Sequence, residues 1–130
     1  GKGGIGKSVV ATNLSVCFAQ RDKRVLHVGC DPKHDSAIRL AVEPQSLKTV
    51  LEIVGDRPGN VAANQIINRG RHGIDLIETG GPTAGLGCAG RGVSRTLELF
   101  DEMELIEAGG YDVAIFDILG DVVCGGFAMP

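Results

Sequence analysis

The sequence lacks the features of several protein classes. No apolar run approaches the ~20 residues that would span a bilayer, and glycines stand at the N-terminus where a secretory signal has an apolar stretch. Lys and Arg number 13 against 16 Asp and Glu, so the formal net charge is −3 and the clustered basic residues of a general nucleic-acid surface are missing. We expect a cytoplasmic protein with no membrane and no nucleic-acid partner. Small anions stay open as ligands, because backbone amides can bind them.

Glycine is the residue in excess, with 20 among 130 residues against a usual share of ~7 %. The hydrophobic fraction of 43 % and the charged fraction of 22 % are ordinary for a soluble globular domain, and they argue against disorder and collagen-like repetition. The length has room for one domain, residues 1–130. The glycines occur in clusters, and these clusters separate the regular segments.

Between the glycine clusters, helical and strand-like patterns alternate. Helices are predicted over 9–20, 47–54 and 89–108, strands over 23–29, 74–78 and 111–117, and loops over 30–35, 79–87 and 118–126, while 57–73 is ambiguous. The apolar stripe of the first helix is expected to consist of Val10, Leu14, Cys17 and Phe18. This order predicts an α/β fold in three layers, with a mostly parallel sheet covered by helices on both faces.

The first glycine cluster, Gly1-Lys-Gly-Gly-Ile-Gly-Lys-Ser8, satisfies the phosphate-loop pattern and leads directly into a helix. Glycines let successive backbone N–H groups point at one anion, and the helix N-terminus adds partial positive charge. Lys7 is expected to reach the β- and γ-phosphates of a nucleoside triphosphate, and Ser8 to bind Mg²⁺. The alternative is a flexible turn before a helix. The nucleotide-binding candidates here are Gly1, Lys2, Gly3, Gly4, Ile5, Gly6, Lys7 and Ser8.

Acidic residues follow two of the predicted strands, at the sheet edge where α/β proteins place ligands. Asp117 ends the strand 111–117 and is the expected metal-side carboxylate, and the N–H of Gly120 could approach a γ-phosphate. Asp31 directly follows the strand 23–29 and could contact the metal or activate water. The alternative for each aspartate is a solvated residue in a turn. Lys33 and Asp35 are further candidates for nucleotide binding, or only a solvated loop.

Four cysteines fall into two groups. Cys17, on the predicted apolar stripe, and Cys30, at a strand end, are expected to be buried packing residues. Cys88 and Cys124 lie in glycine-rich loops near predicted helix starts, where thiolates are favoured. Two thiolates are too few for an iron–sulfur cluster, but a two-fold dimer doubles them. From spacing alone, inert cysteines, a Zn²⁺ ion shared by two chains and a shared cluster all stay open, whereas a disulfide is not expected.

Several motifs together resemble the nitrogenase iron protein family, the ATP-dependent dinitrogenase reductases, along the whole chain. They are Gly1-Lys-Gly-Gly-Ile-Gly-Lys-Ser8, Gly29-Cys-Asp-Pro-Lys33, Gly80-Gly-Pro82, Gly87-Cys-Ala-Gly-Arg-Gly92 and the segment 117–130. Lys2 also resembles the signature lysine of deviant phosphate-loop ATPases, which pair face to face. That resemblance implies a P-loop NTPase fold and a homodimer in which Lys2 contacts the partner's nucleotide.

The family resemblance further implies electron transfer driven by MgATP. One [4Fe–4S] cluster per homodimer would be bridged by Cys88 and Cys124 of each subunit. Lys2, Asp31 and Asp121 would be the catalytic residues of hydrolysis, and the segment 117–121 would link nucleotide to cluster. Arg91 matches an arginine that some members modify by ADP-ribosylation; the alternative is a surface arginine that docks an acidic partner. The implied partners are a dinitrogenase-like protein of the molybdenum–iron type and a ferredoxin or flavodoxin donor.

Departures from the family pattern leave other functions open. Val9 and Val10 stand where the family usually has Thr, His34 stands where a small residue is common, and 47–73 resembles the family poorly. One alternative is a sister reductase that serves a tetrapyrrole or another substrate, and a third hypothesis is a cluster-free partitioning ATPase. The motif around Cys88 resembles the nitrogenase proteins more than the protochlorophyllide reductase subunit, and so favours nitrogenase. Since a phosphate loop normally follows a strand, we expect a central fragment of a longer protein, incomplete at both ends and inactive in isolation.

Overall fold

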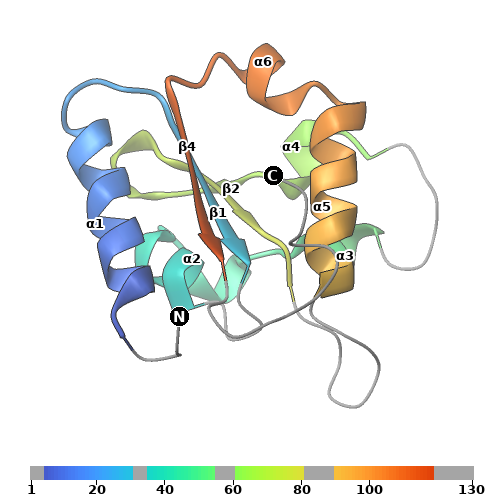
Figure 1. The fold of residues 1–130 in the computed structure, drawn as a ribbon, viewed down its shortest axis with the longest axis horizontal. Coiled ribbons are helices and arrows are strands. Elements are labelled where there is room, and N and C mark those ends of the chain that lie inside the picture. Colours follow the sequence, from blue (N-terminus) through green and yellow to red (C-terminus); the bar gives the residue numbers. More distant parts are fainter. Residues whose placement is uncertain (1–4, 31–34, 55–60, 81–89, 119–130) are drawn as a thin grey trace.

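The computed structural model describes residues 5–30, 35–54, 61–80 and 90–118. Helices and strands alternate along this part of the chain (Figure 1). In chain order they are α1 (Lys7–Ala19), β1 (Val25–Cys30), α2 (Asp35–Leu40), η1 (Pro44–Ser46), α3 (Val50–Val54), α4 (Ala63–Ile66), β2 (Asn68–Arg69), η2 (Arg71–Gly73), β3 (Asp75–Glu78), α5 (Gly90–Glu102), α6 (Leu105–Gly109) and β4 (Val113–Ile118).

The sheet has the strand order β2-β3-β1-β4. Strand β1 pairs in parallel with β3 on one side and with β4 on the other, whereas the two-residue strand β2 pairs antiparallel with β3. All six residues of β1 are buried, which explains the nearly continuous apolar character of this segment. The predicted α/β fold with a mostly parallel sheet is therefore confirmed, and β2 is an antiparallel strand from the region that the sequence left ambiguous.

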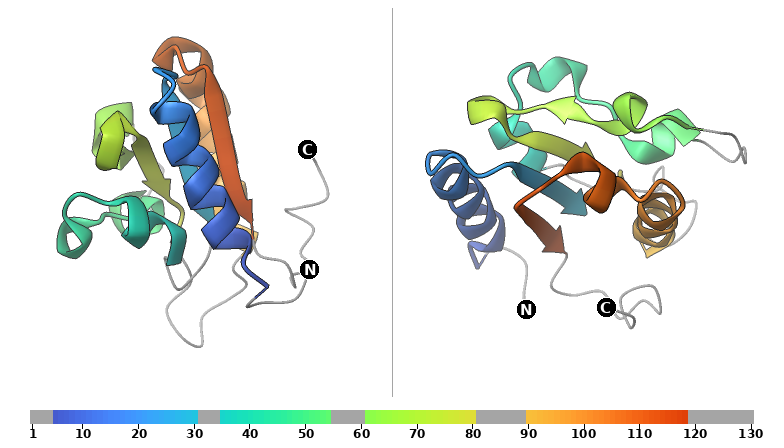
Figure 2. Two further views of the ribbon diagram at one scale, coloured as in Figure 1. Left: turned by 90° about the vertical axis from the view of Figure 1, so that its left-hand side faces the viewer. Right: turned by 90° about the horizontal axis from the view of Figure 1, so that it is seen from above.

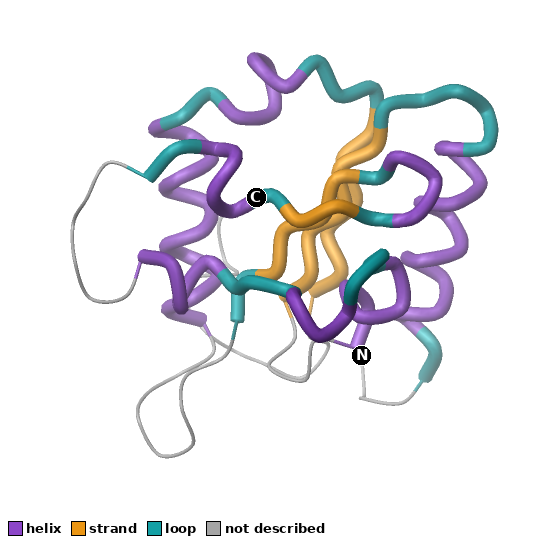
Figure 3. Tube along the Cα trace, turned by 180° about the vertical axis from the view of Figure 1, so that it is seen from behind, coloured by secondary structure: helices purple, strands orange, loops and turns teal. Residues whose placement is uncertain are grey.

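Helices cover both faces of the sheet, as Figures 1 and 2 show. On one face, Leu26, Val28 and Cys30 of β1 pack in a buried cluster with residues of α3, α4, α5 and α6. On the other face, Val25 lies in a second cluster with Leu40 at the end of α2 and with half-buried residues of α1. The alternation of side chains along β1 thus supplies both cores, and the strands lie between the two helical layers when seen from behind (Figure 3).

The face that α1 buries differs from the predicted one. Val10 and Leu14 are 59 % and 46 % exposed, and Cys17 is exposed, so the prediction that Cys17 is buried is wrong. The fully or nearly buried residues of α1 are instead Thr12 and Ser15. Small apolar side chains occur nearly all round this helix, so hydrophobic periodicity does not determine which face is buried. The buried face is the one from which Ser15 makes the polar contact described below.

The predicted helix over 89–108 is two helices in the structure. Helix α5 ends at Glu102, and α6 begins at Leu105. Between them, Glu104 has a left-handed backbone with φ of 45°, a conformation that interrupts a right-handed helix. The break lets both Phe100 and Leu105 enter the same core cluster. No helix within the described ranges has the length and apolar character needed to cross a bilayer.

Candidate functional site

The predicted site residues that the structure describes gather at one edge of the sheet. Strands β1, β3 and β4 are parallel, so their C-terminal ends meet at the same edge, and α1 begins beside this edge (Figure 1). Glu78 and Asp117 stand at or next to the ends of β3 and β4, and Gly29 stands next to the end of β1. This edge is where open α/β sheets bind ligands.

The start of α1 has the local geometry that an anion site needs. Gly6 has φ of 93°, and a Cβ added there would meet no atom within 4 Å. The left-handed backbone, and not crowding, is therefore what favours glycine at this position. The first turn of α1 holds no acidic residue, and no side chain caps it. The helix begins at Lys7, followed by Ser8, so the residues expected to bind phosphate and Mg²⁺ lie in the first turn.

Asp117 is a buried carboxylate at the same edge. It is 5 % exposed, and its Oδ2 atom has no hydrogen-bond partner in the described part of the protein. In the parallel register Asp117 pairs with Gly29 of β1, so its side chain and the open face of Gly29 lie on the same side of the sheet. A buried carboxylate oxygen without a partner is the type of atom that a metal ion or a bound water satisfies.

His27 and Ser15 join α1 to the middle of the sheet, and the sequence reasoning missed both. His27 is fully buried in β1, and its Nδ1 lies 2.8 Å from Ser15 Oγ. Burial lowers the pKa of His27 to about 4, against a smaller raising effect of the Asp117 charge. The ring is therefore neutral at pH 7. The only sequence signal was a single polar residue inside an otherwise apolar strand, which pointed to a strand and not to a contact.

Cys30 is buried and chemically quiet, as its predicted packing role implies. It is 3 % exposed, and burial, with smaller effects from the Glu78 and Asp117 charges, raises its pKa to about 12. Its thiol therefore stays protonated at neutral pH, and a protonated thiol is a poor nucleophile and metal ligand. Within the described ranges, no group of three or more His, Cys, Asp or Glu residues is arranged to hold a metal ion.

Other predicted site residues fall where the structure gives no account of them. Asp35 and Arg91 are the first residue of α2 and the second of α5, and their side chains are not described. Outside the described residues lie Gly1, Lys2, Gly3, Gly4, Asp31, Lys33, Cys88, Gly120, Asp121 and Cys124. Of the predicted nucleotide-binding residues, the structure therefore describes the positions of Ile5, Gly6, Lys7, Ser8 and Asp117, with Ile5 exposed. It does not test the cysteine pair.

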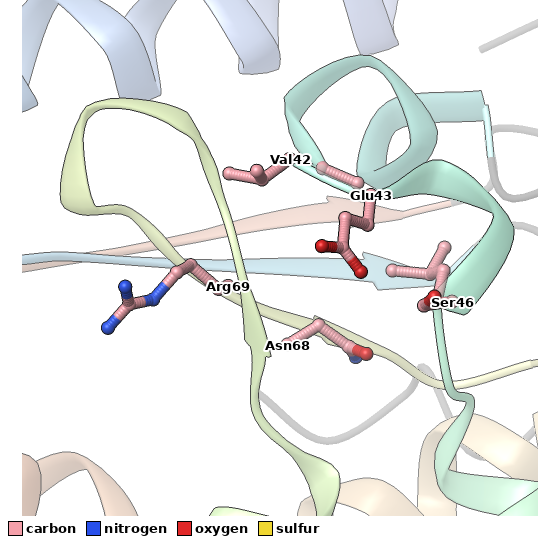
Figure 4. Close-up of a pocket in the computed structure, with 7 residues that line it drawn as sticks. Val42, Glu43, Ser46, Asn68 and Arg69 are labelled. Carbon is pink, nitrogen blue, oxygen red and sulfur yellow. The ribbon is translucent and has the colours of Figure 1, made fainter.

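A pocket of about 210 Å³ lies away from this edge, between the segment that joins α2 to η1 and the edge strand β2 (Figure 4). Asn68 lines it, but the Asn68 side chain is already engaged, because it accepts a hydrogen bond from Lys48 N and donates one to Lys48 O, both 2.9 Å long. The Arg69 side chain points away from Glu43 and Ser46. We assign no function to this pocket.

Comparison with known sequences gives one family. The whole chain, residues 1–130, matches the family described as 4Fe-4S iron sulfur cluster binding proteins, NifH/frxC family. The chain is 48 % identical over 131 aligned residues to the light-independent protochlorophyllide reductase iron-sulfur ATP-binding protein of Rubrivivax gelatinosus, and 49 % identical to that of Rhodopseudomonas palustris. Both alignments cover all of this chain but only 43 % and 41 % of the relatives.

Solved structures give the same fold. Cobyrinic acid a,c-diamide synthase from Mycobacterium smegmatis with bound ADP and magnesium matches 89 % of this chain and 46 % of its own, with a TM-score of 0.60 and 25 % identity. The MinC:MinD cell division protein complex of Aquifex aeolicus matches 90 % of this chain and 43 % of its own, with a TM-score of 0.60 and 20 % identity. These matches show that the fold is shared. At such low identities they do not by themselves show a shared function.

Proposed function

The chain belongs to the NifH/frxC family of 4Fe-4S iron–sulfur cluster binding proteins, and from this we propose that the intact protein is the ATP-binding reductase component of a two-component, nitrogenase-like enzyme. The observation that carries the proposal is the pairing, at one sheet edge, of an uncapped helix start at Gly6 with the buried, unpartnered carboxylate oxygen of Asp117. Such a pairing offers N–H groups to phosphates and an acid to their metal ion.

The residues present fit a magnesium nucleotide. Lys7 would neutralise the terminal phosphates, Ser8 would bind the metal through its hydroxyl, and Asp117 would hold the metal side through its free oxygen. The likeness to a protein with bound ADP and magnesium supports this assignment. The nucleotide supplies, when bound, a γ-phosphate whose presence or absence can order the surrounding loops. The proposed binding set is completed by Lys33 and Asp35, which follow β1 in the sequence, and by Gly120. Lys2 would reach the nucleotide of the other subunit.

The protein's own residues would convert nucleotide state into a movement. Asp31 follows β1 and Asp121 follows β4, and we propose that both assist hydrolysis. Asp117 stands seven positions before Cys124 in the sequence, so a shift of the segment after β4 at its nucleotide end can move the thiolate at its other end. We propose that Cys88 and Cys124 from each subunit of a homodimer hold one [4Fe–4S] cluster, which supplies single electrons.

The proposed partner is the catalytic part of a protochlorophyllide reductase or a related tetrapyrrole reductase. The relatives named above support it, since each is the iron–sulfur ATP-binding protein of such an enzyme. A second candidate is a dinitrogenase of the molybdenum–iron type, which the motif Gly87-Cys-Ala-Gly-Arg-Gly92 favours. In either case a ferredoxin or flavodoxin would donate the electrons. Arg91 is a candidate for ADP-ribosylation or for docking of an acidic partner surface.

Anaerobic purification of the intact protein tests the cluster. We expect a brown dimer with about four irons, and loss of colour and iron in Cys88→Ala and Cys124→Ala, with Cys17→Ala as the matched control that keeps both. A colourless, iron-free ATPase would refute the redox function, and zinc in place of iron would indicate a structural metal. The wild-type protein, mixed with protochlorophyllide reductase catalytic subunits or with dinitrogenase, then distinguishes the two partners by which substrate is reduced.

A further inference from the structure

Glu78 is a charged side chain in an unusual position. It is the last residue of β3 and is fully buried, although burying a carboxylate is unfavourable unless polar groups surround it. The proposed nucleotide chemistry gives it no task. In the sheet, Glu78 pairs with Gly29 of β1, and Gly29 pairs on its other side with Asp117 of β4. The side chains of Glu78 and Asp117 therefore flank Gly29 on one face of the sheet.

The Glu78 carboxylate lies over Gly29 and depends on the missing side chain there. A Cβ on Gly29 would overlap Glu78 Oε2 and would lie 3.3 Å from Ser36 Oγ of α2. Ser36 Oγ is buried and has no hydrogen-bond partner in the described part of the protein. Gly29 thus leaves a small polar space in which the carboxylate of β3 reaches towards α2.

The other oxygen of Glu78 holds the chain that follows β3. Gly80 N–H donates a hydrogen bond of 3.4 Å to Glu78 Oε1, and Thr79 N–H donates one of 2.9 Å to Gly29 O. Gly80 has φ of 80°, so the chain turns sharply at this point. Cys88 follows Gly80 by eight positions, and Asp31 follows Gly29 by two. The Glu78 side chain therefore contacts the residues that precede both of these segments.

We propose that Glu78 is a positioning residue that couples the loop after β1, on the nucleotide side, to the loop after β3, which carries Cys88. The proposal rests on the proposed function, because it assumes that nucleotide binding rearranges the loop after β1. In this coupling, a change at Asp31 shifts the backbone at Gly29. The Glu78 carboxylate moves with Gly29 because it lies against it. Gly80 then moves as well, because its N–H donates to Glu78 Oε1. This connection is separate from the segment between Asp117 and Cys124.

Hydrogen exchange in the intact protein tests the coupling without relying on activity. In the wild type, MgADP is expected to slow amide exchange in residues 79–90. In Glu78→Ala this nucleotide-dependent slowing should fall about 5-fold, the factor that corresponds to one lost hydrogen bond. The dissociation constant for MgADP, measured by calorimetry, should stay within about twofold, because the proposal gives the Glu78 carboxylate a place beside Gly29 and Gly80 and no part in binding phosphate.

Two further variants separate coupling from folding. Gly29→Ala keeps the Glu78 residue, but the added methyl group displaces its carboxylate. This variant should therefore show the same reduced slowing of exchange by MgADP in residues 79–90 as Glu78→Ala. Glu78→Gln keeps an oxygen that can accept from Gly80 N–H, so it should restore most of the response. Glu43→Ala, which removes an exposed carboxylate, is the matched control and should respond as the wild type. If Glu78→Ala fails to fold, the contrast between Gly29→Ala and Glu78→Gln decides.

Two results would overturn the coupling role alone. One is an unchanged response in Gly29→Ala or Glu78→Ala, and the other is loss of MgADP binding itself in variants that remain folded, which would make Glu78 part of the binding site. A wild-type protein that does not bind MgADP would instead refute the proposed function, and with it the coupling that depends on it.

Discussion

Replacing His27 should change how the stability of the protein depends on pH. The imidazole is fully buried, and its pKa is lowered from 6.5 to about 4 in the folded protein. Between these values the unfolded chain binds a proton that the folded protein does not, so stability falls as the pH drops from 6.5 towards 4 and the loss is complete below 4. One group with this shift contributes about 3 kcal/mol in full, and about 1.3 kcal/mol of it is lost between pH 7.5 and 5.5.

The assay is urea unfolding of wild type and His27→Gln at pH 7.5, 6.5 and 5.5. Gln removes the titrating group, while its amide can still bond to Ser15 Oγ. The wild type should lose about 1.3 kcal/mol more than the variant between pH 7.5 and 5.5, and His34 and His72 cancel in the comparison because both proteins contain them. Equal losses would refute the reasoning, since they would mean that the pKa of His27 is the same in the folded and unfolded states, as for a ring open to water.

Other predictions follow from single contacts. Gly6→Ala should weaken nucleotide binding and destabilise the protein by about 1 kcal/mol in thermal unfolding, because its φ of 93° disfavours a Cβ; an unchanged affinity would contradict the placement of the phosphates. Alkylation of the native protein at pH 8 should label the exposed Cys17 and spare Cys30, whose thiol is buried with a pKa of about 12; mass spectrometry of peptides that showed Cys30 labelled first would refute this. Tyr111→Phe should lower the free energy of unfolding in urea by about 1 kcal/mol, since Tyr111 donates a 2.7 Å hydrogen bond to Asp75. In a double-mutant cycle, the same substitution should have a smaller effect in the Asp75→Asn background.

The sequence predicts those parts of the fold that local patterns determine. The start of α1 at the Gly-Lys-Ser motif, the strands that became β1, β3 and β4, and the burial of Cys30 all follow from residues close together in the chain. The break at Glu104 does not, because neither glycine nor proline marks it and the left-handed turn serves packing of Leu105 in a distant core. Helix α1 is apolar on several sides, so only its partners on β1 determine which side is buried.

Within the candidate site, the same distinction between local and distant information applies. The phosphate-loop residues and Asp117 could be identified from their motifs, because each motif carries its chemistry in adjacent positions. Glu78, His27 and Ser36 could not, because their meaning depends on the register of β1 against β3 and β4 and on the packing of α1 and α2. Sequence reading interpreted the first two as parts of strands and gave no role to the third.

The close fit of Glu78 over Gly29 has a consequence for how the family can vary. The two positions lie far apart in the chain but share one volume, since a side chain at position 29 would occupy the place of the Glu78 carboxylate. Each position therefore limits the substitutions that evolution can accept at the other. In homologues, we expect a residue larger than glycine at position 29 to be accompanied by a side chain shorter than Glu at position 78, so that the pair changes together or is retained together.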